Sequence, residues 1–278
     1  MNKKGRVFDC FPFFNELDVL DMRLNILNEH VDYFVLVESK RSHQKKPKQL
    51  YYEKNKHLFE KFNKKIIHIV KPDEPDNFGR EVTPDVAMQE EIDHRNYIRH
   101  LSNYIELKET DVFLISDVDE IPKLTSDMLT ESRLRLEHLH FVYNFNNIVT
   151  NPSNLKNWAG TVIVNYDDFL SESRKWEKNT KYKGYFRHGG EGVRPIKNAG
   201  WHLSYFGDEN MIKTKLEHFC HPEVNTQSIN NIKEHINSGT DFLGWFRGGA
   251  FSQLTDYSVL PEYILNNKEK YSKFFNGR

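Results

Sequence analysis

The feature that most constrains the fold is a series of short, continuously apolar runs in the first 122 residues, separated by stretches with helical spacing. An apolar run without polar alternation is typical of a parallel strand that is covered on both faces. Strands that alternate with helices predict an α/β fold with a mainly parallel central sheet flanked by helices. We expect strands at 6–11, 32–39, 66–70 and 111–116, a helix that carries Leu17, Leu20, Leu24 and Leu27, and a second helix that opens at Thr83-Pro84.

The pattern changes after Pro122, where apolar stretches are longer and helical spacing is sparser. The stretches at 139–149 and 158–164 indicate further strands of antiparallel type. A short helix is expected after Pro261. Because no repeat and no linker divides the 278 residues, we expect one domain over 1–278 made of two halves, 1–122 and 123–278.

Charge and cysteine content exclude several classes of protein. The 39 basic and 40 acidic residues give a net charge of -1, which offers a nucleic-acid partner no electrostatic support. Two cysteines do not make a disulfide framework. No apolar stretch has the length of a signal peptide or a transmembrane segment. These features predict a cytoplasmic protein, and they leave the oligomeric state open.

The most informative motif is Asp117-Val118-Asp119, which follows the apolar run at 113–116. Ligands of open α/β sheets lie beyond the carboxyl ends of the strands. Two carboxylates at such an end can converge on Mg²⁺ or Mn²⁺, and that cation would neutralise charge on a leaving diphosphate. The same residues can also simply form a turn. In a haloacid-dehalogenase-like phosphatase, the first Asp would be a nucleophile and the second a general acid/base.

Other polar residues occupy positions near this sheet edge. Glu38 and Ser39 close a second predicted parallel strand, where they could contact a base or ribose, or could form an ordinary turn. Arg95 and Asn96 lie on the helix before the Asp-x-Asp strand, where a surface ion pair is the alternative. His202 follows Gly200 and Trp201, and its imidazole could complete a Mn²⁺ shell. A non-catalytic carbohydrate-binding protein is a further alternative, since 13% of the residues are aromatic.

Several motifs in chain order resemble glycosyltransferase family 17. Together they span nearly the whole chain: Phe8–Glu16, Leu20–Leu24, Val31–Ser39, Arg95-Asn96, Asp117–Pro122, Ala199–His202 and Lys215–Asn225. The last of these, Lys215–Asn225, is a tail of the bacterial type. The resemblance implies a GT-A-like fold, with a nucleotide-sugar-binding half over 1–122 and an acceptor half over 123–278. It also implies inverting transfer from a UDP-sugar, with UDP-GlcNAc as the expected donor.

The resemblance also implies roles for individual residues. Asp117 and Asp119 would serve the metal and the nucleotide, and His202 would be an additional metal ligand. An inverting enzyme needs a base that takes the proton of the acceptor hydroxyl. Glu217 and Glu191 are the preferred candidates. The motifs of the second half match compact microbial or viral relatives, so the expected acceptor is a surface polysaccharide, a lipid-linked glycan or a viral glycan.

Overall fold

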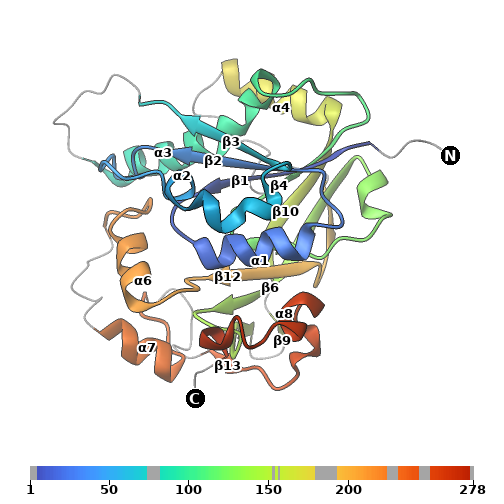
Figure 1. The fold of residues 1–278 in the computed structure, drawn as a ribbon. Helices are drawn as coiled ribbons and strands as arrows, with labels where there is room; N and C mark the ends of the chain where they lie inside the picture. The colour runs from blue at the N-terminus through green and yellow to red at the C-terminus, as the bar shows by residue number, and fades with distance from the viewer. Residues whose placement is uncertain are drawn as a thin grey trace.

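The computed structural model describes residues 5–73, 82–151, 154–155, 157–178, 193–223, 231–243 and 251–275. A central sheet runs through the molecule, with helices on both sides of it (Figure 1). This architecture confirms the predicted α/β class. The strands of the nucleotide half are β1 (Val7–Phe13), β2 (Tyr33–Ser39), β3 (Ile66–Lys71), β4 (Val112–Ile115) and β5 (Glu120–Pro122). Its α-helices are α1 (Leu17–Leu27), α2 (Tyr51–Asn55) and α3 (Pro84–Asn96).

The second half combines two long strands with several short ones. Its strands in the central sheet are β6 (Arg133–Val142), β7 (Asn147–Ile148), β10 (Asn157–Asn165), β11 (Arg194–Ile196), β12 (Gly200–Ser204) and β13 (Ser252–Gln253), and β8 (Thr150–Asn151) pairs with β9 (Asn154–Leu155) outside it. Its α-helices are α4 (Tyr166–Lys178), α6 (Glu209–Leu216), α7 (Ile232–Ser238) and α8 (Glu262–Asn266). In the described part of the chain, no helix has the length and hydropathy needed to cross a membrane.

The four long strands of the nucleotide half are parallel and adjacent, in the order β3-β2-β1-β4. Their predicted positions are confirmed to within a few residues. The helix with the leucine spacing is α1, and α3 begins at Pro84, where the Thr83 side chain accepts a hydrogen bond from the Val86 amide. Because the strands are parallel, their carboxyl ends meet at one edge of the sheet.

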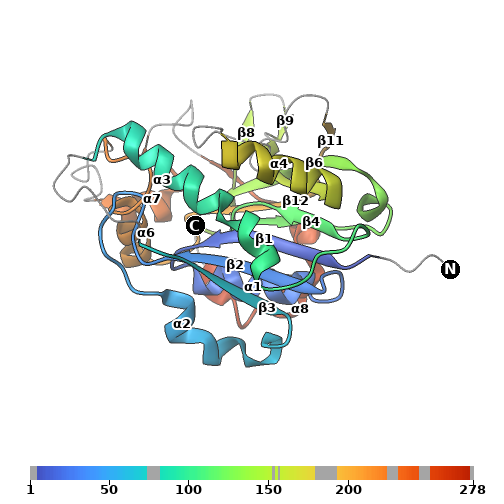
Figure 2. The ribbon, with the colours of Figure 1, turned by 90° about the horizontal axis from the view of Figure 1, so that it is seen from above.

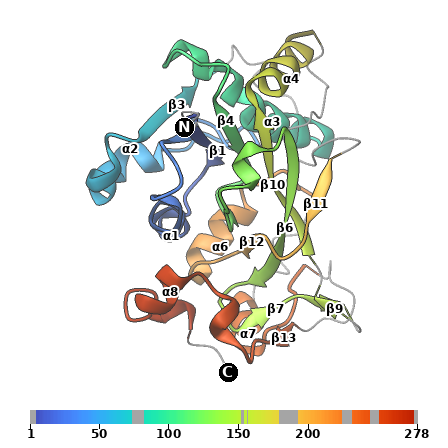
Figure 3. The same cartoon turned by 90° about the vertical axis from the view of Figure 1, so that its right-hand side faces the viewer.

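Alternate residues of β1 point to opposite faces of the sheet, and each face has its own core. Phe11 and Phe13 belong to the cluster that packs on α1. Phe8 and Cys10 belong to the cluster that includes Phe169 of α4. Figures 2 and 3 show α1 on one side of the sheet, with α3 and α4 on the other. Covered faces on both sides explain why these strands read as continuous apolar runs.

The first long strand of the second half differs from its prediction. The expected strand at 139–149 was wrong at both ends, because β6 spans Arg133–Val142. Tyr143 has a φ of 69°, outside the range of an extended strand, so the chain turns there before β7. The 158–164 run is confirmed as part of β10, which pairs antiparallel with both β4 and β6.

The strand β12 joins the two halves, since it pairs with β5 and with β6. Gly200 makes this pairing possible. Its φ is +157°, and a Cβ there would lie 2.5 Å from the Ile121 carbonyl oxygen and from His138 Cδ2. The register of β12 then sets His202 opposite Glu120, directly after the Asp-x-Asp turn. A division of function between the halves stays a prediction.

Candidate functional site

A pocket of about 170 Å³, partly open to solvent, lies at the carboxyl ends of β1, β2 and β4. Its walls come from the end of β1, the loop after β2, helix α3, the Asp-x-Asp turn and the end of α6. The lining residues are Pro12, Phe13, Phe14, Glu16, Arg41, Ser42, His43, Lys48, Glu91, His94, Arg95, Asp117, Val118, Asp119, Lys215, His218, Phe219 and Cys220. The motif predicted from the sequence therefore lies in a pocket at the expected edge of the sheet.

Asp117 is held by an arginine from the preceding helix. Arg95 Nε donates to Asp117 Oδ1 at 2.9 Å, and Arg95 Nη2 donates to Asp117 Oδ2 at 2.9 Å. Glu91 accepts from the same guanidinium at 3.0 Å. Burial opposes the charge of Arg95, but Asp117 and Glu91 raise its pKa overall. Both oxygens of Asp117 are thus engaged by a permanent cation.

Asp119 faces the second half of the chain instead. Lys215 Nζ of α6 donates to Asp119 Oδ2 at 3.2 Å and lies 3.0 Å from Glu16 Oε1. On the other side, His202 Nε2 of β12 lies 3.8 Å from Asp119 Oδ1. Burial alone would lower the pKa of Lys215, but the charges of Asp119 and Glu16 raise it well above its usual value. The two carboxylates of the motif therefore have different partners.

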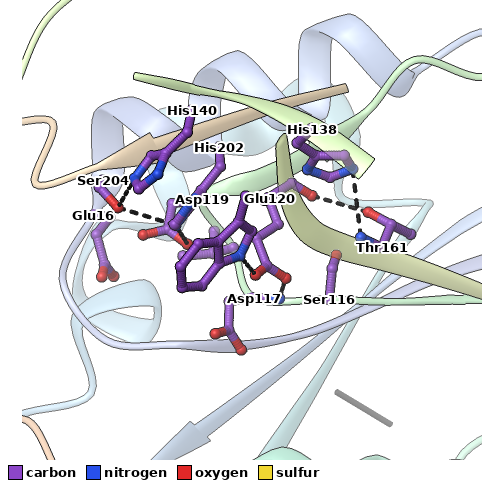
Figure 4. A network of polar contacts seen from close by, with 12 residues as sticks. Glu16, Ser116, Asp117, Asp119, Glu120, His138, His140, Thr161, His202 and Ser204 are labelled. Atoms are coloured by element: carbon purple, nitrogen blue, oxygen red, sulfur yellow. Dashed lines mark hydrogen bonds and ion pairs between the residues drawn. The ribbon is translucent and has the colours of Figure 1, made fainter. Parts of the chain in front are cut away.

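His202 packs against two other rings, and its polar contacts with Ser204 and Asp119 belong to a buried network (Figure 4). Its ring centroid is 4.5 Å from that of His140 and 4.4 Å from that of Trp158. The Ser204 hydroxyl lies 3.1 Å from His202 Nε2 and 3.1 Å from His140 Nε2. This packing fixes the direction of the imidazole toward Asp119.

The third carboxylate of the motif, Glu120, closes the turn. Its Oε2 accepts from the Asp117 amide at 2.8 Å, and its Oε1 accepts from the Trp158 indole at 2.6 Å (Figure 4). Its backbone carbonyl accepts from the Thr161 hydroxyl at 3.2 Å. With both oxygens bonded and only 5% of the residue exposed, Glu120 holds the turn in place.

Arg23 supports the same turn from α1, a role that was not predicted from the sequence. It is fully buried on α1 and forms two bonds to Asp9, at 2.8 and 2.7 Å. Its Nη1 donates to the backbone carbonyls of Asp117, Val118 and Glu120 at 2.9, 3.2 and 2.9 Å. Arg23 therefore holds the backbone of the Asp-x-Asp turn. The signal was present, since Arg23 shares a helical face with Leu20 and Leu27.

The donor atoms near Asp119 fit a divalent cation in part. Asp119 Oδ1 from the Asp-x-Asp turn and His202 Nε2 from β12 approach each other and are donor types that Mn²⁺ accepts. Each oxygen of Asp117 already accepts one hydrogen bond from Arg95 and keeps one lone pair, so the role of Asp117 as a metal ligand stays a prediction. Within the described ranges, no three Asp, Glu, His or Cys side chains cluster as a complete ligand set. Two protein ligands leave most of a coordination sphere to phosphate oxygens and water, as Mg²⁺ sites commonly do.

The other residues expected to bind the donor lie behind the pocket wall. Glu38 is fully buried, accepts from the Tyr52 amide at 3.2 Å and lies 3.1 Å from His68 Nε2. The Ser39 hydroxyl accepts from the Arg41 amide at 3.2 Å. Asn96 is 2% exposed near the end of α3. None of these three is among the residues that line the pocket, so their contact with a donor stays a prediction.

Of the two acidic residues preferred as general base, the structure describes only Glu217. Glu217 is exposed at the carboxyl end of α6 and does not line the pocket. Its backbone carbonyl accepts from Lys46 Nζ at 2.7 Å. Glu191 lies outside the described residues. The base therefore stays a prediction.

Comparison with known proteins gives a family and two relatives. A model of glycosyltransferase family 17 matches residues 1–278. A beta-1,4-mannosyl-glycoprotein 4-beta-N-acetylglucosaminyltransferase from Rattus norvegicus is 23% identical over 304 residues. The match covers 96% of this chain and 54% of the relative, so the chain spans about half of that protein's length.

Among solved structures, the chain is similar to the mannosyltransferase PcManGT from Pyrobaculum calidifontis in complex with GDP-Man and Mn²⁺. The TM-score is 0.42 at 10% identity, and the match covers 78% of this chain and 62% of that chain. At this similarity, no residue role transfers from that structure to the present pocket.

Proposed function

Because this chain belongs to glycosyltransferase family 17, we propose that it is a metal-dependent inverting transferase that moves GlcNAc from UDP-GlcNAc onto a glycan hydroxyl. The observation that carries the proposal is the pocket at the ends of the parallel strands, where Asp119 and His202 converge beside Lys215. The name of the rat relative supports an N-acetylglucosaminyl donor.

The proposed chemistry assigns different work to the two carboxylates. In the reaction, the acceptor oxygen bonds to the anomeric carbon, the bond from that carbon to the diphosphate breaks, and a base takes the hydroxyl proton. A divalent cation held by Asp119 and His202 would supply charge stabilisation to the leaving diphosphate. Asp117 keeps Arg95 at the pocket wall, where its guanidinium adds positive charge.

A phosphatase mechanism fits this geometry less well. The nucleophilic Asp of such an enzyme attacks phosphorus with a carboxylate lone pair, and a bidentate ion pair with arginine makes that carboxylate a weaker nucleophile. Both oxygens of Asp117 accept hydrogen bonds from Arg95 at 2.9 Å. A non-catalytic binding protein would have no use for Asp119 and His202 beside a half-buried lysine.

The test is a thermal-shift panel of UDP-GlcNAc, GDP-mannose and other nucleotide sugars, each with and without Mn²⁺. We expect UDP-GlcNAc to stabilise the protein only when the metal is present. Metal-dependent hydrolysis of the same donor would then give a turnover assay that needs no acceptor. If no UDP-sugar shifts the melting temperature with Mn²⁺, the proposal fails.

The acceptor is proposed as a lipid-linked glycan or a surface polysaccharide built in the cytoplasm. These classes differ in whether transfer needs a lipid carrier. Radiolabelled GlcNAc from the donor would be traced into lipid extracts and into soluble polysaccharide separately. Label in neither fraction would contradict this acceptor proposal.

A further inference from the structure

Two histidines on the pocket wall form a hydrogen-bonded relay that the proposed reaction does not use. His94 of α3 is 5% exposed, and His43 lies half-buried in the loop after β2. His94 Nε2 lies 3.0 Å from the Val37 carbonyl oxygen, and His94 Nδ1 lies 3.4 Å from His43 Nε2. Both histidines line the pocket.

The carbonyl at one end of the relay fixes the positions of the protons. A carbonyl oxygen only accepts, so His94 Nε2 carries a proton and donates it to Val37. In neutral His94 the other nitrogen, Nδ1, is then an acceptor, and His43 Nε2 must donate to it. In neutral His43 the remaining nitrogen, Nδ1, carries a lone pair and accepts.

Both imidazoles are neutral at pH 7. Burial lowers the pKa of His43 to about 4, and the nearby Arg95 adds to this effect. Burial and the adjacent His43 lower the pKa of His94 well below its usual value. Among the residues that the structure describes, His43 Nδ1 has no hydrogen-bond partner. The relay thus fixes His43 Nδ1 as a hydrogen-bond acceptor on the pocket wall.

The residue before His43 offers a hydrogen-bond donor instead of an acceptor. Ser42 is 5% exposed and also lines the pocket. Its hydroxyl oxygen accepts from the Lys46 amide at 3.2 Å, which leaves the hydroxyl proton available to donate. The Ser42 amide donates to the Lys46 carbonyl at 2.9 Å, so the loop that carries both residues is closed by its own hydrogen bonds. One acceptor and one donor therefore lie side by side in sequence on the same wall.

We propose that His43 reads the base of the donor nucleotide, accepting the ring N–H of uracil at Nδ1 while Ser42 donates to a neighbouring carbonyl of the ring. The proposal rests on the proposed function and names the residues that select the base. Uracil presents an N–H between two carbonyl oxygens, which matches this pair. Cytosine presents a bare ring nitrogen at the same position, so two lone pairs would face each other without a proton between them.

The experiment is calorimetric titration of UDP and of CDP with Mn²⁺ present, for the wild type and two variants of His43. We expect the wild type to prefer UDP by roughly 10- to 100-fold, because a buried acceptor without a donor is costly. In His43→Phe, which keeps a ring but has no acceptor, the preference should fall to less than about threefold through weaker UDP binding. His43→Asn restores an acceptor oxygen near the place of Nδ1 and should recover part of the preference.

A second measurement tests the relay itself. Long-range ¹H–¹⁵N spectra of the wild type should show His43 as the Nε2–H tautomer, with Nδ1 shifting when UDP binds and not when CDP is added. His94→Gln, which can still donate to Val37 and accept from His43, should preserve the tautomer. His94→Leu should allow both tautomers and reduce the UDP preference by a smaller factor than His43→Phe.

The outcomes separate this inference from the function on which it rests. If the wild type binds no uridine nucleotide, the proposed donor is wrong. If it binds UDP and His43→Phe keeps the wild-type ratio of UDP to CDP affinity, the assignment of His43 is overturned while the proposed function stands. An Nδ1–H tautomer of His43 in the UDP complex would overturn the assignment as well.

Discussion

The nucleotide half and the acceptor half both contribute charged residues to the pocket, but they hold them differently. In the nucleotide half, Arg23 and Asp9 pair with no exposed surface, entirely within that half. In the acceptor half, Lys215 keeps 22% of its side chain exposed and pairs with Asp119 and Glu16 across the boundary. Arg23 thus holds the backbone of the Asp-x-Asp turn from within the first half, with further bonds to Glu120 from Trp158 and Thr161 of β10, whereas the surroundings of Asp119 depend on the docking of α6 and β12.

This difference suggests how each half responds to change. Loss of a charge inside the nucleotide half leaves its partner buried without water, which is costly. Loss of a charge from the acceptor half leaves a partner that already borders the pocket and can be hydrated. The expected effects below run from the largest to the smallest.

The largest effect is expected for Arg23→Met. It leaves Asp9 buried without its cation and three carbonyls of the turn without their donor, so the free energy of unfolding should fall by about 3–5 kcal/mol. Urea denaturation would measure this change. Lys213→Met is the matched control in the acceptor half, because its ion pair with Glu209 is exposed, and it should change stability by less than about 0.5 kcal/mol. Equal losses in the two variants would remove the contrast between the halves.

The two carboxylates of the motif should differ in activity. Asp119→Asn removes the carboxylate that faces His202, and metal-dependent hydrolysis of UDP-GlcNAc should fall by about 10³-fold or more. Asp117→Asn acts through Arg95, and a loss of roughly 10- to 100-fold is expected. The turnover rate at saturating Mn²⁺ is the measurement. Wild-type turnover in Asp119→Asn would show that the metal assignment is wrong.

A buried histidine should make the acceptor half sensitive to acid. His138 on β6 is fully buried, and burial lowers its pKa to about 3. The unfolded chain takes up a proton near pH 6.5 and the folded chain does not, so stability is complete above pH 6.5 and is lost as the pH falls. Between pH 7 and pH 5 this costs about 2 kcal/mol. In His138→Gln, the fall in unfolding free energy between these pH values should shrink by that amount, and a slope equal to that of the wild type would refute the assignment.

The smallest effect is expected for Lys215→Met without added metal. The variant leaves Asp119 and Glu16 without their shared cation, but both residues line the pocket and can contact water. The unfolding free energy should fall by roughly 1 kcal/mol. Urea titration would measure this change as well. A loss as large as that of Arg23→Met would show that the ion pairs of Lys215 contribute as much to stability as those of Arg23.

Much of the nucleotide half could be predicted from the sequence, because its strands are covered on both faces and therefore read as apolar runs. The second half was harder to predict. β6 begins at Arg133 with alternating polar and apolar residues. Because these residues do not form a continuous apolar run, the start of this strand was not predicted. Its end depends on the left-handed backbone of Tyr143, a residue type that gives no local signal for that conformation.

The site shows the same division. The position of Asp117 and Asp119 at a strand end followed from the apolar run before them, and Arg95 was placed near them because it lies on the preceding helix. No pattern in the sequence singled out the base, and Glu217, one of the two preferred candidates, is exposed where α6 ends, so its role stays a prediction. Lys215 of the same helix does line the pocket, so the docking of α6 against distant segments decides which of its side chains face the site.

By itself, the sequence determined the α/β class, the alternation of strands and helices in the first half, and the motif that the pocket would contain. These features depend on periodicity and local spacing. Only the tertiary structure decided which charges meet. It paired Asp117 with Arg95, Asp119 with Lys215 and His202, and Arg23 with the turn, and it linked His43 through His94 to a backbone carbonyl. The physical reason is that hydrogen bonds act over about 3 Å, and residues far apart in the chain come within that range only after the sheet has formed.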